Sequence, residues 1–97
     1  MAERVPDITV PKVIEANADA VETMRCWWTG AGNHMVFRPI FEDPRAFGFM
    51  LAEAAKHLSA VYAAKDSSSP EDALAKIHEG WRDGNEAPMV TRMERDD

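Results

Sequence analysis

The sequence predicts an α+β protein in which an antiparallel β-hairpin is followed by two α-helices. Two observations support this order. Two segments of strand-forming residues flank a glycine-containing turn. Two later segments each begin with a polar residue and a proline and continue with apolar residues at helical spacing. A lone hairpin is only marginally stable, so we expect dimerisation to complete the fold.

The hairpin is expected over residues 21–29 and 34–41, with the turn at residues 30–33. Both segments are rich in β-branched and aromatic residues, and the turn contains two glycines. Pro39 has no backbone N–H, so the second strand should end near it or lie at an edge. Successive residues of a strand point to opposite faces. We expect the core face to comprise Met24, Cys26, Trp28, Met35 and Phe37.

The other face of the hairpin is half apolar. If both helices cover the core face, this outer face is left in water, and such a patch marks an interface. We therefore expect a homodimer through Trp27, Val36 and Ile40, with the sheets joined edge to edge, face to face or both. The alternative is that the N-terminal arm folds across the same face through its apolar residues, Val10, Val13 and Ile14.

The first helix is expected over residues 44–65. Asp43 can accept a hydrogen bond from the first free amides, and Pro44 suits the first helical position. Apolar residues recur along one face at spacings of three and four: Phe47, Leu51, Ala54, Leu58 and Val61. A neighbouring row of small residues would let another backbone approach closely: Gly48, Ala52, Ala55 and Ser59.

The second helix is expected over residues 70–83, starting after Ser69 in the same manner and ending at Gly84. One of its faces carries Leu74, Ile77, His78 and Trp81. The chain then divides into an N-terminal arm (1–20), in which two prolines oppose helix, a single α+β domain (21–84) and a polar C-terminal tail (85–97) that should fray.

Composition restricts the class of protein. The chain has 97 residues, of which 45% are hydrophobic, enough for one core and too few for two. No apolar run reaches the roughly 18–20 residues of a membrane helix, and the first residues lack the pattern of a secretory signal. The single cysteine, Cys26, excludes an internal disulfide and fits a reducing compartment. We expect a cytoplasmic protein.

Charge is distributed unevenly along the chain. The formal net charge is −6, but residues 21–66 carry five acids and five bases, so the excess acid lies toward the ends. An acidic protein repels the phosphate backbone, and we expect no nucleic-acid partner.

One group of side chains could bind a ligand. Two arginines beside an indole on the outer face of the hairpin could hold a small acidic or planar molecule: Arg25, Trp27, His34 and Arg38. The structural alternative is that these arginines pair with acids such as Glu42 or Asp43, or with acids of a second subunit, while their stems cover the indole.

No catalytic constellation is present in the sequence. The three histidines fall in three different elements, and Glu53 with His57 makes only a weak helix pair. Cys26 on the expected core face is interpreted as a small buried hydrophobe. We therefore expect no catalytic residues, no metal and no cofactor, and a small non-enzymatic homo-oligomeric module.

Two segments together resemble a small uncharacterised family of single-domain proteobacterial proteins. The first runs from Met24-Arg25-Cys26-Trp27 through the turn to Val36-Phe37-Arg38. The second is Asp43-Pro44-x-x-Phe47-Gly48-x-x-Leu51-Ala52, followed by His57. The resemblance spans about residues 22–81. It implies a bacterial cytoplasmic protein with no assigned activity, and it carries over no catalytic residue.

Overall fold

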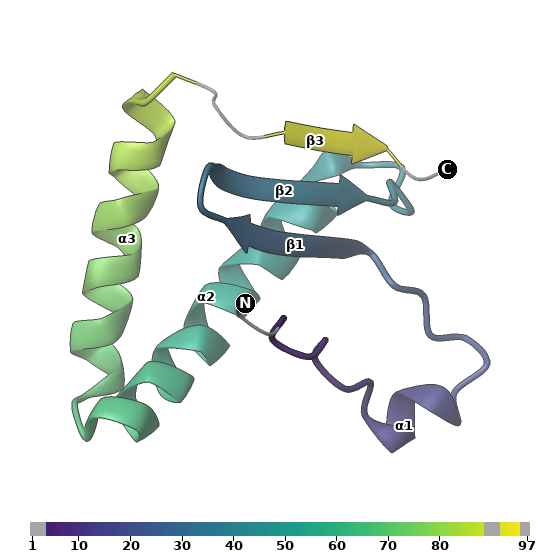
Figure 1. The fold of residues 1–97 in the computed structure, drawn as a ribbon, viewed down its shortest axis with the longest axis horizontal. Helices are drawn as coiled ribbons and strands as arrows, with labels where there is room; N and C mark the ends of the chain where they lie inside the picture. Colours follow the sequence, from purple (N-terminus) through teal and green to yellow (C-terminus); the bar gives the residue numbers. More distant parts are fainter. Residues whose placement is uncertain (1–3, 89–91, 96–97) are drawn as a thin grey trace.

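The computed structural model describes residues 4–88 and 92–95. Three strands form one sheet in the order β1-β2-β3, with β1 antiparallel and β3 parallel to β2. The predicted α+β class, a hairpin followed by two helices, is confirmed (Figure 1). The elements are α1 (Lys12–Glu15), β1 (Met24–Thr29), β2 (Gly32–Phe37), α2 (Pro44–Asp66), α3 (Pro70–Glu86) and β3 (Arg92–Arg95).

The hairpin turns more tightly than the sequence predicts. Its loop is two residues long, because the Thr29 hydroxyl accepts from the amide of Ala31 at 3.2 Å and donates to the Gly32 carbonyl at 3.0 Å. Gly32 has φ 132°, a conformation that side chains disfavour. At the other end the Arg38 amide donates to the Thr23 carbonyl at 2.8 Å, and pairing with β1 stops before Pro39.

Both helices start as predicted. The Asp43 carboxylate accepts from the amide of Arg45 at 2.9 Å, and the Ser69 hydroxyl accepts from the amide of Asp72 at 3.1 Å. The predicted end of α3 at Gly84 is wrong, because the helix continues to Glu86. It ends where Pro88 forces the preceding residue, Ala87, into an extended conformation with ψ 149°.

The two ends of the chain contain elements that we did not expect. The single-turn helix α1 begins directly after Pro11, which is extended and serves as its N-cap. In the tail expected to fray, β3 pairs with β2 and is parallel to it. The connection permits this direction, because parallel strands need a long crossover and the chain returns to the sheet only after two helices.

The contact between α2 and α3 involves only the last part of the row of small residues, since Gly48 and Ala52 are exposed. Ser59 of that row is 3% exposed, and Ala63, one turn further along, is 8% exposed. Small side chains let the two helices approach closely here. As a result α3 does not cover the apolar stripe of α2, and Leu58 and Val61 remain exposed.

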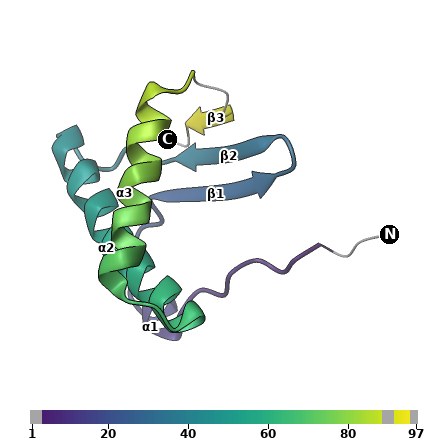
Figure 2. The ribbon, with the colours of Figure 1, turned by 90° about the vertical axis from the view of Figure 1, so that its left-hand side faces the viewer.

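The sheet is not covered by the helices as we expected. Strands pair with strands and α2 packs against α3, but among the described elements no helix backbone lies close alongside a strand. At the base of the hairpin the hydroxyl of Thr23, just before β1, lies 3.8 Å from the sulfur of Met50 on α2. Figure 2 shows the hairpin and the N-terminal arm projecting from the same side of the helix pair. The expected core face is therefore only partly covered: Met24, Met35 and Phe37 are half-buried, whereas Cys26 is exposed and Trp28 is 76% exposed.

Candidate functional site

The register of the hairpin places the candidate ligand-binding residues together. Arg25 pairs with Val36, and Trp27 pairs with His34 on the neighbouring strand. Directly paired residues of an antiparallel sheet lie on the same face, so these four side chains share one face, as the alternation predicts. Arg38 extends the same face, since its amide bonds to the Thr23 carbonyl in line with the ladder.

An arginine, an indole and an imidazole form the centre of this face. The ring centroids of Trp27 and His34 lie 6.3 Å apart with the planes at 79°, an edge-to-face contact. The guanidinium carbon of Arg25 lies 5.2 Å from the centroid of the Trp27 ring, a cation–π contact. Trp27 and His34 are half-buried, and Arg25 is exposed.

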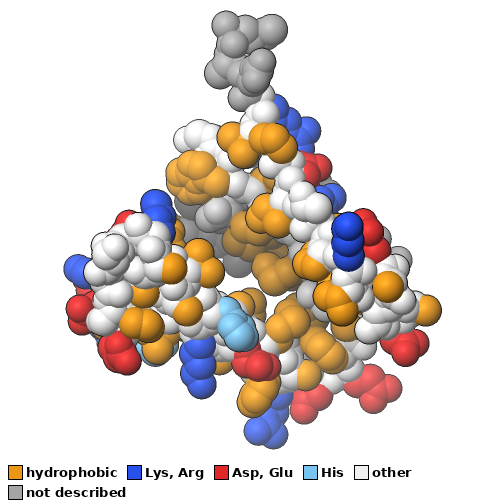
Figure 3. All heavy atoms as spheres, turned by 90° about the horizontal axis from the view of Figure 1, so that it is seen from below, with side chains coloured by type: hydrophobic (Ala, Val, Ile, Leu, Met, Phe, Trp, Pro, Cys, Tyr) orange, Lys and Arg blue, Asp and Glu red, His pale blue; other side chains and the backbone are white. Residues whose placement is uncertain are grey.

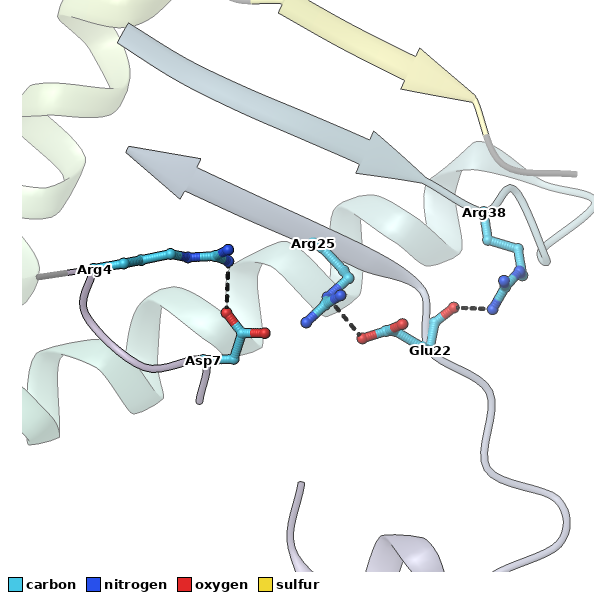
Figure 4. Close-up of polar contacts among 5 residues, drawn as sticks. All are labelled: Arg4, Asp7, Glu22, Arg25 and Arg38. Carbon is cyan, nitrogen blue, oxygen red and sulfur yellow. Dashed lines mark hydrogen bonds and ion pairs between the residues drawn. The ribbon is translucent and has the colours of Figure 1, made fainter. Parts of the chain in front are cut away.

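Glu22 binds both arginines of the cluster. Its carboxylate Oε2 lies 3.3 Å from Nε of Arg25, and its backbone carbonyl accepts from Nη1 of Arg38 at 2.9 Å (Figure 4). We had considered Glu42 or Asp43 as the acidic partners, whereas Arg25 pairs with the acid three residues before it. The ion pair is exposed and adds little stability, but Glu22 brings both guanidinium groups to the same end of β1.

The predicted interface residues differ in exposure. Trp27 and Val36 are half-buried, and Ile40, beyond the end of β2, is exposed. On the opposite face of the hairpin Cys26 and Trp28 are exposed, whereas Met24, Met35 and Phe37 are half-buried. The interpretation of Cys26 as a buried hydrophobe is therefore wrong for the single chain, because no helix packs over it.

The remaining titratable candidates lie apart from this cluster. His57 on α2 and His78 on α3 are exposed, as is Glu53. Within residues 4–88, no three His, Cys, Asp or Glu side chains form a group that could hold a metal ion. The described helices also include none that is both long and apolar enough to cross a bilayer.

Two clefts were missed by the sequence analysis. One, of about 770 Å³, separates the extended arm at residues 4–11 from β1. The other, of about 650 Å³, lies between α2 and α3 beside Tyr62 and Ile77. The first cleft has a signal in the sequence. Val5 and Ile8 are apolar residues in a segment with neither helical nor strand periodicity, which indicates an extended arm with side chains available for packing.

The fold and this surface define a small α+β protein with an open hairpin. The family model for the domain of unknown function DUF5076 matches residues 7–89, so the chain belongs to that family. This confirms the resemblance to an uncharacterised small family. A search of curated proteins found no match.

A solved structure shares the fold. It is described as "a putative pyruvate dehydrogenase from the photosynthetic bacterium Rhodopseudomonas palustrus CGA009". The TM-score is 0.70 and the sequences are 28% identical, with 93% of this chain and 95% of that chain covered. The likeness therefore extends over nearly the whole of both chains.

Proposed function

We propose that the chain is a non-enzymatic homo-oligomeric interaction module whose fold is completed by a second copy of itself. One observation carries this proposal: the single chain has almost no core. Among the side chains that the structure describes, only Ala63 and Ser59 are buried, and fourteen large hydrophobic residues are exposed. Burial of apolar surface is the dominant favourable term in folding, so a chain this open needs another source of burial.

The surface area supports the same proposal. The chain exposes 8776 Å², whereas a folded monomer of its 10.8 kDa mass exposes about 5,500 Å². The Cα radius of gyration is 15.5 Å, against about 12.5 Å for a compact domain of 97 residues. Standard protein interfaces bury about 800 Å² per partner, so the excess area is large enough to include an interface.

The exposed apolar side chains are grouped. Figure 3 shows a hollowed face with hydrophobic side chains gathered around the hollow. Contiguous apolar surface of this kind marks protein–protein contact on soluble domains. The exposed residues come from the arm, the hairpin and both helices, among them Ile8, Trp28, Phe49, Val61 and Trp81.

We infer further that the chain has no catalytic activity of its own. The name of the Rhodopseudomonas structure refers to pyruvate dehydrogenase. In this chain the three histidines lie on β2, α2 and α3, and the thiol of Cys26 lies on the face of β1 opposite His34. A catalytic constellation needs an acid or base within hydrogen-bond reach of a nucleophile, and none of the hydrogen bonds of the described side chains involves Cys26.

A second candidate function is the binding of a small acidic or planar ligand on the outer face of the hairpin. The observation that favours it is the cluster of Arg25, Trp27 and His34, in which a cation and two rings meet on one face. Arg38 lies at the end of the same face, with its guanidinium held by the Glu22 carbonyl.

Unfolding in urea at two protein concentrations tests the first proposal. If folding and association are coupled, raising the concentration from 1 to 100 μM stabilises the folded state by about 2.7 kcal/mol through mass action. The urea midpoint should then rise by about 1 M, given the usual slopes for small proteins. A midpoint that does not change with concentration would contradict the proposal, because a monomer unfolds independently of its concentration.

A further inference from the structure

We infer that the second copy binds along the free edge of β1, so that two antiparallel β1 strands join the two sheets into one continuous sheet. This rests on the proposed self-association and says where it occurs. In the sheet order β1-β2-β3, β1 lies at an edge and, among the strands that the structure describes, pairs on one side only. An unpaired strand edge is a template for pairing with another chain.

The backbone groups that face outward from β1 can be assigned. The Arg38 amide bonds to the Thr23 carbonyl, so Thr23 belongs to a hydrogen-bonded pair of the antiparallel ladder. Hydrogen-bonded pairs alternate along such a ladder, so Arg25, Trp27 and Thr29 also bond toward β2. The N–H and C=O groups of the residues between them therefore point away from β2. These residues are Met24, Cys26 and Trp28.

This edge lacks the usual protection against pairing. Natural edge strands carry lysine, proline, bulges or a covering segment, and β1 has the sequence MRCWWT. Its one charge, on Arg25, is paired with Glu22. The arm lies across the cleft of about 770 Å³ from β1, and no backbone hydrogen bond joins residues 4–11 to β1.

A second copy is the occupant that fits this edge. A two-fold axis across the strand makes the two β1 strands antiparallel, so each outward residue can exchange both bonds with the partner strand. The flanking side chains of Cys26 and Trp28 are uncharged and exposed, and residues 21–66 carry no net charge to oppose association. The excess surface of the chain, about 3,000 Å², is more than one partner buries in a standard dimer.

Amide hydrogen exchange of the full chain, followed residue by residue by NMR at a concentration where the mass is that of an oligomer, tests this inference. The hairpin alone protects the amides of Arg25 and Trp27 and leaves those of Cys26 and Trp28 open. Pairing along the edge should slow exchange at Cys26 and Trp28 about tenfold or more relative to an open edge. Protected and open amides would then no longer alternate along β1. Persistent alternation in an oligomer would overturn the inference and leave the proposed function standing.

A charge on the edge provides the second test. Trp28→Lys should convert the oligomer to a monomer in sedimentation at 50 μM, with Cys26→Lys as a second variant in case the first does not fold by circular dichroism. Phe49→Lys is the matched control, because Phe49 on α2 is similarly exposed, at 70%, and does not belong to the edge strand. It should remain oligomeric.

The other outcomes overturn the inference in distinguishable ways. If Cys26 and Trp28 are protected but both edge variants stay oligomeric, the arm of the same chain covers the edge. If Phe49→Lys dissociates and the edge variants do not, the helices form the interface. A wild-type chain that is monomeric at every concentration overturns both the edge inference and the proposed function.

Discussion

Trp27 links the two strands of the hairpin through its side chain. Its ring contacts Arg25 on its own strand and His34 on the neighbouring one. Exposed cation–π contacts are worth about 0.5–1 kcal/mol, enough to hold an arginine in place but not to build a core. The same contacts serve either candidate function, because a guanidinium held on an indole can face a partner chain or an anion.

Tryptophan fluorescence separates these two uses of the cluster. If the cluster is a structural part of the module, a panel of small carboxylates and planar metabolites should produce no saturable change in emission. Saturable quenching that weakens in Arg25→Ala and Arg38→Ala, but not in Arg45→Ala, would support ligand binding. Arg45 is a suitable control because it is exposed at the start of α2.

At the scale of elements, the contact between α2 and α3 depends on small side chains. Ala63→Leu would insert three heavy atoms where the helices are closest, and overpacking of this kind costs about 1–3 kcal/mol. The adjacent Ala64→Leu makes the same change at an exposed position and should alter the unfolding free energy by less than about 0.5 kcal/mol. Urea unfolding of the two variants at one concentration measures both. Equal effects would show that α3 does not pack on this row.

The sequence predicts most elements because local chemistry determines them. Asp43 and Ser69 cap the helices at the expected positions, since a side-chain oxygen satisfies amides that have no helical partner. The two faces of the hairpin follow from strand alternation. The end of α3 can also be predicted from the sequence. Pro88 excludes a helical conformation at Ala87, whereas Gly84 only lowers the helix propensity at its own position.

The sequence does not determine which surfaces meet. The apolar stripe through Leu58 and Val61 predicts burial, but the buried positions of α2 are Ser59 and Ala63 instead. Periodicity shows that a face is apolar and cannot say whether this chain or another one covers it. For the same reason Cys26 and Trp28 were assigned to a core, whereas they flank an open sheet edge. β3 carries no local signal, because its pairing with β2 depends on two intervening helices.

At the scale of the whole molecule, both the shape and the charge distribution are compatible with the proposed self-association. The chain extends over 41 × 37 × 33 Å and exposes far more surface than its mass requires. Its segment 21–66, which contains the hairpin and α2, carries no net charge, while the ends carry the excess acid of a chain at −6. The proposed association through the neutral segment would leave the acidic ends free to repel further copies.

Native mass spectrometry of the gently purified protein tests self-association most directly, because it reads subunit number and any bound mass together. We expect a discrete oligomer, with a dimer at twice 10.8 kDa, and no additional mass. A monomer at micromolar concentration would contradict it. So would an additional small mass on every chain that is lost in Arg25→Ala, which would instead identify a ligand-binding protein.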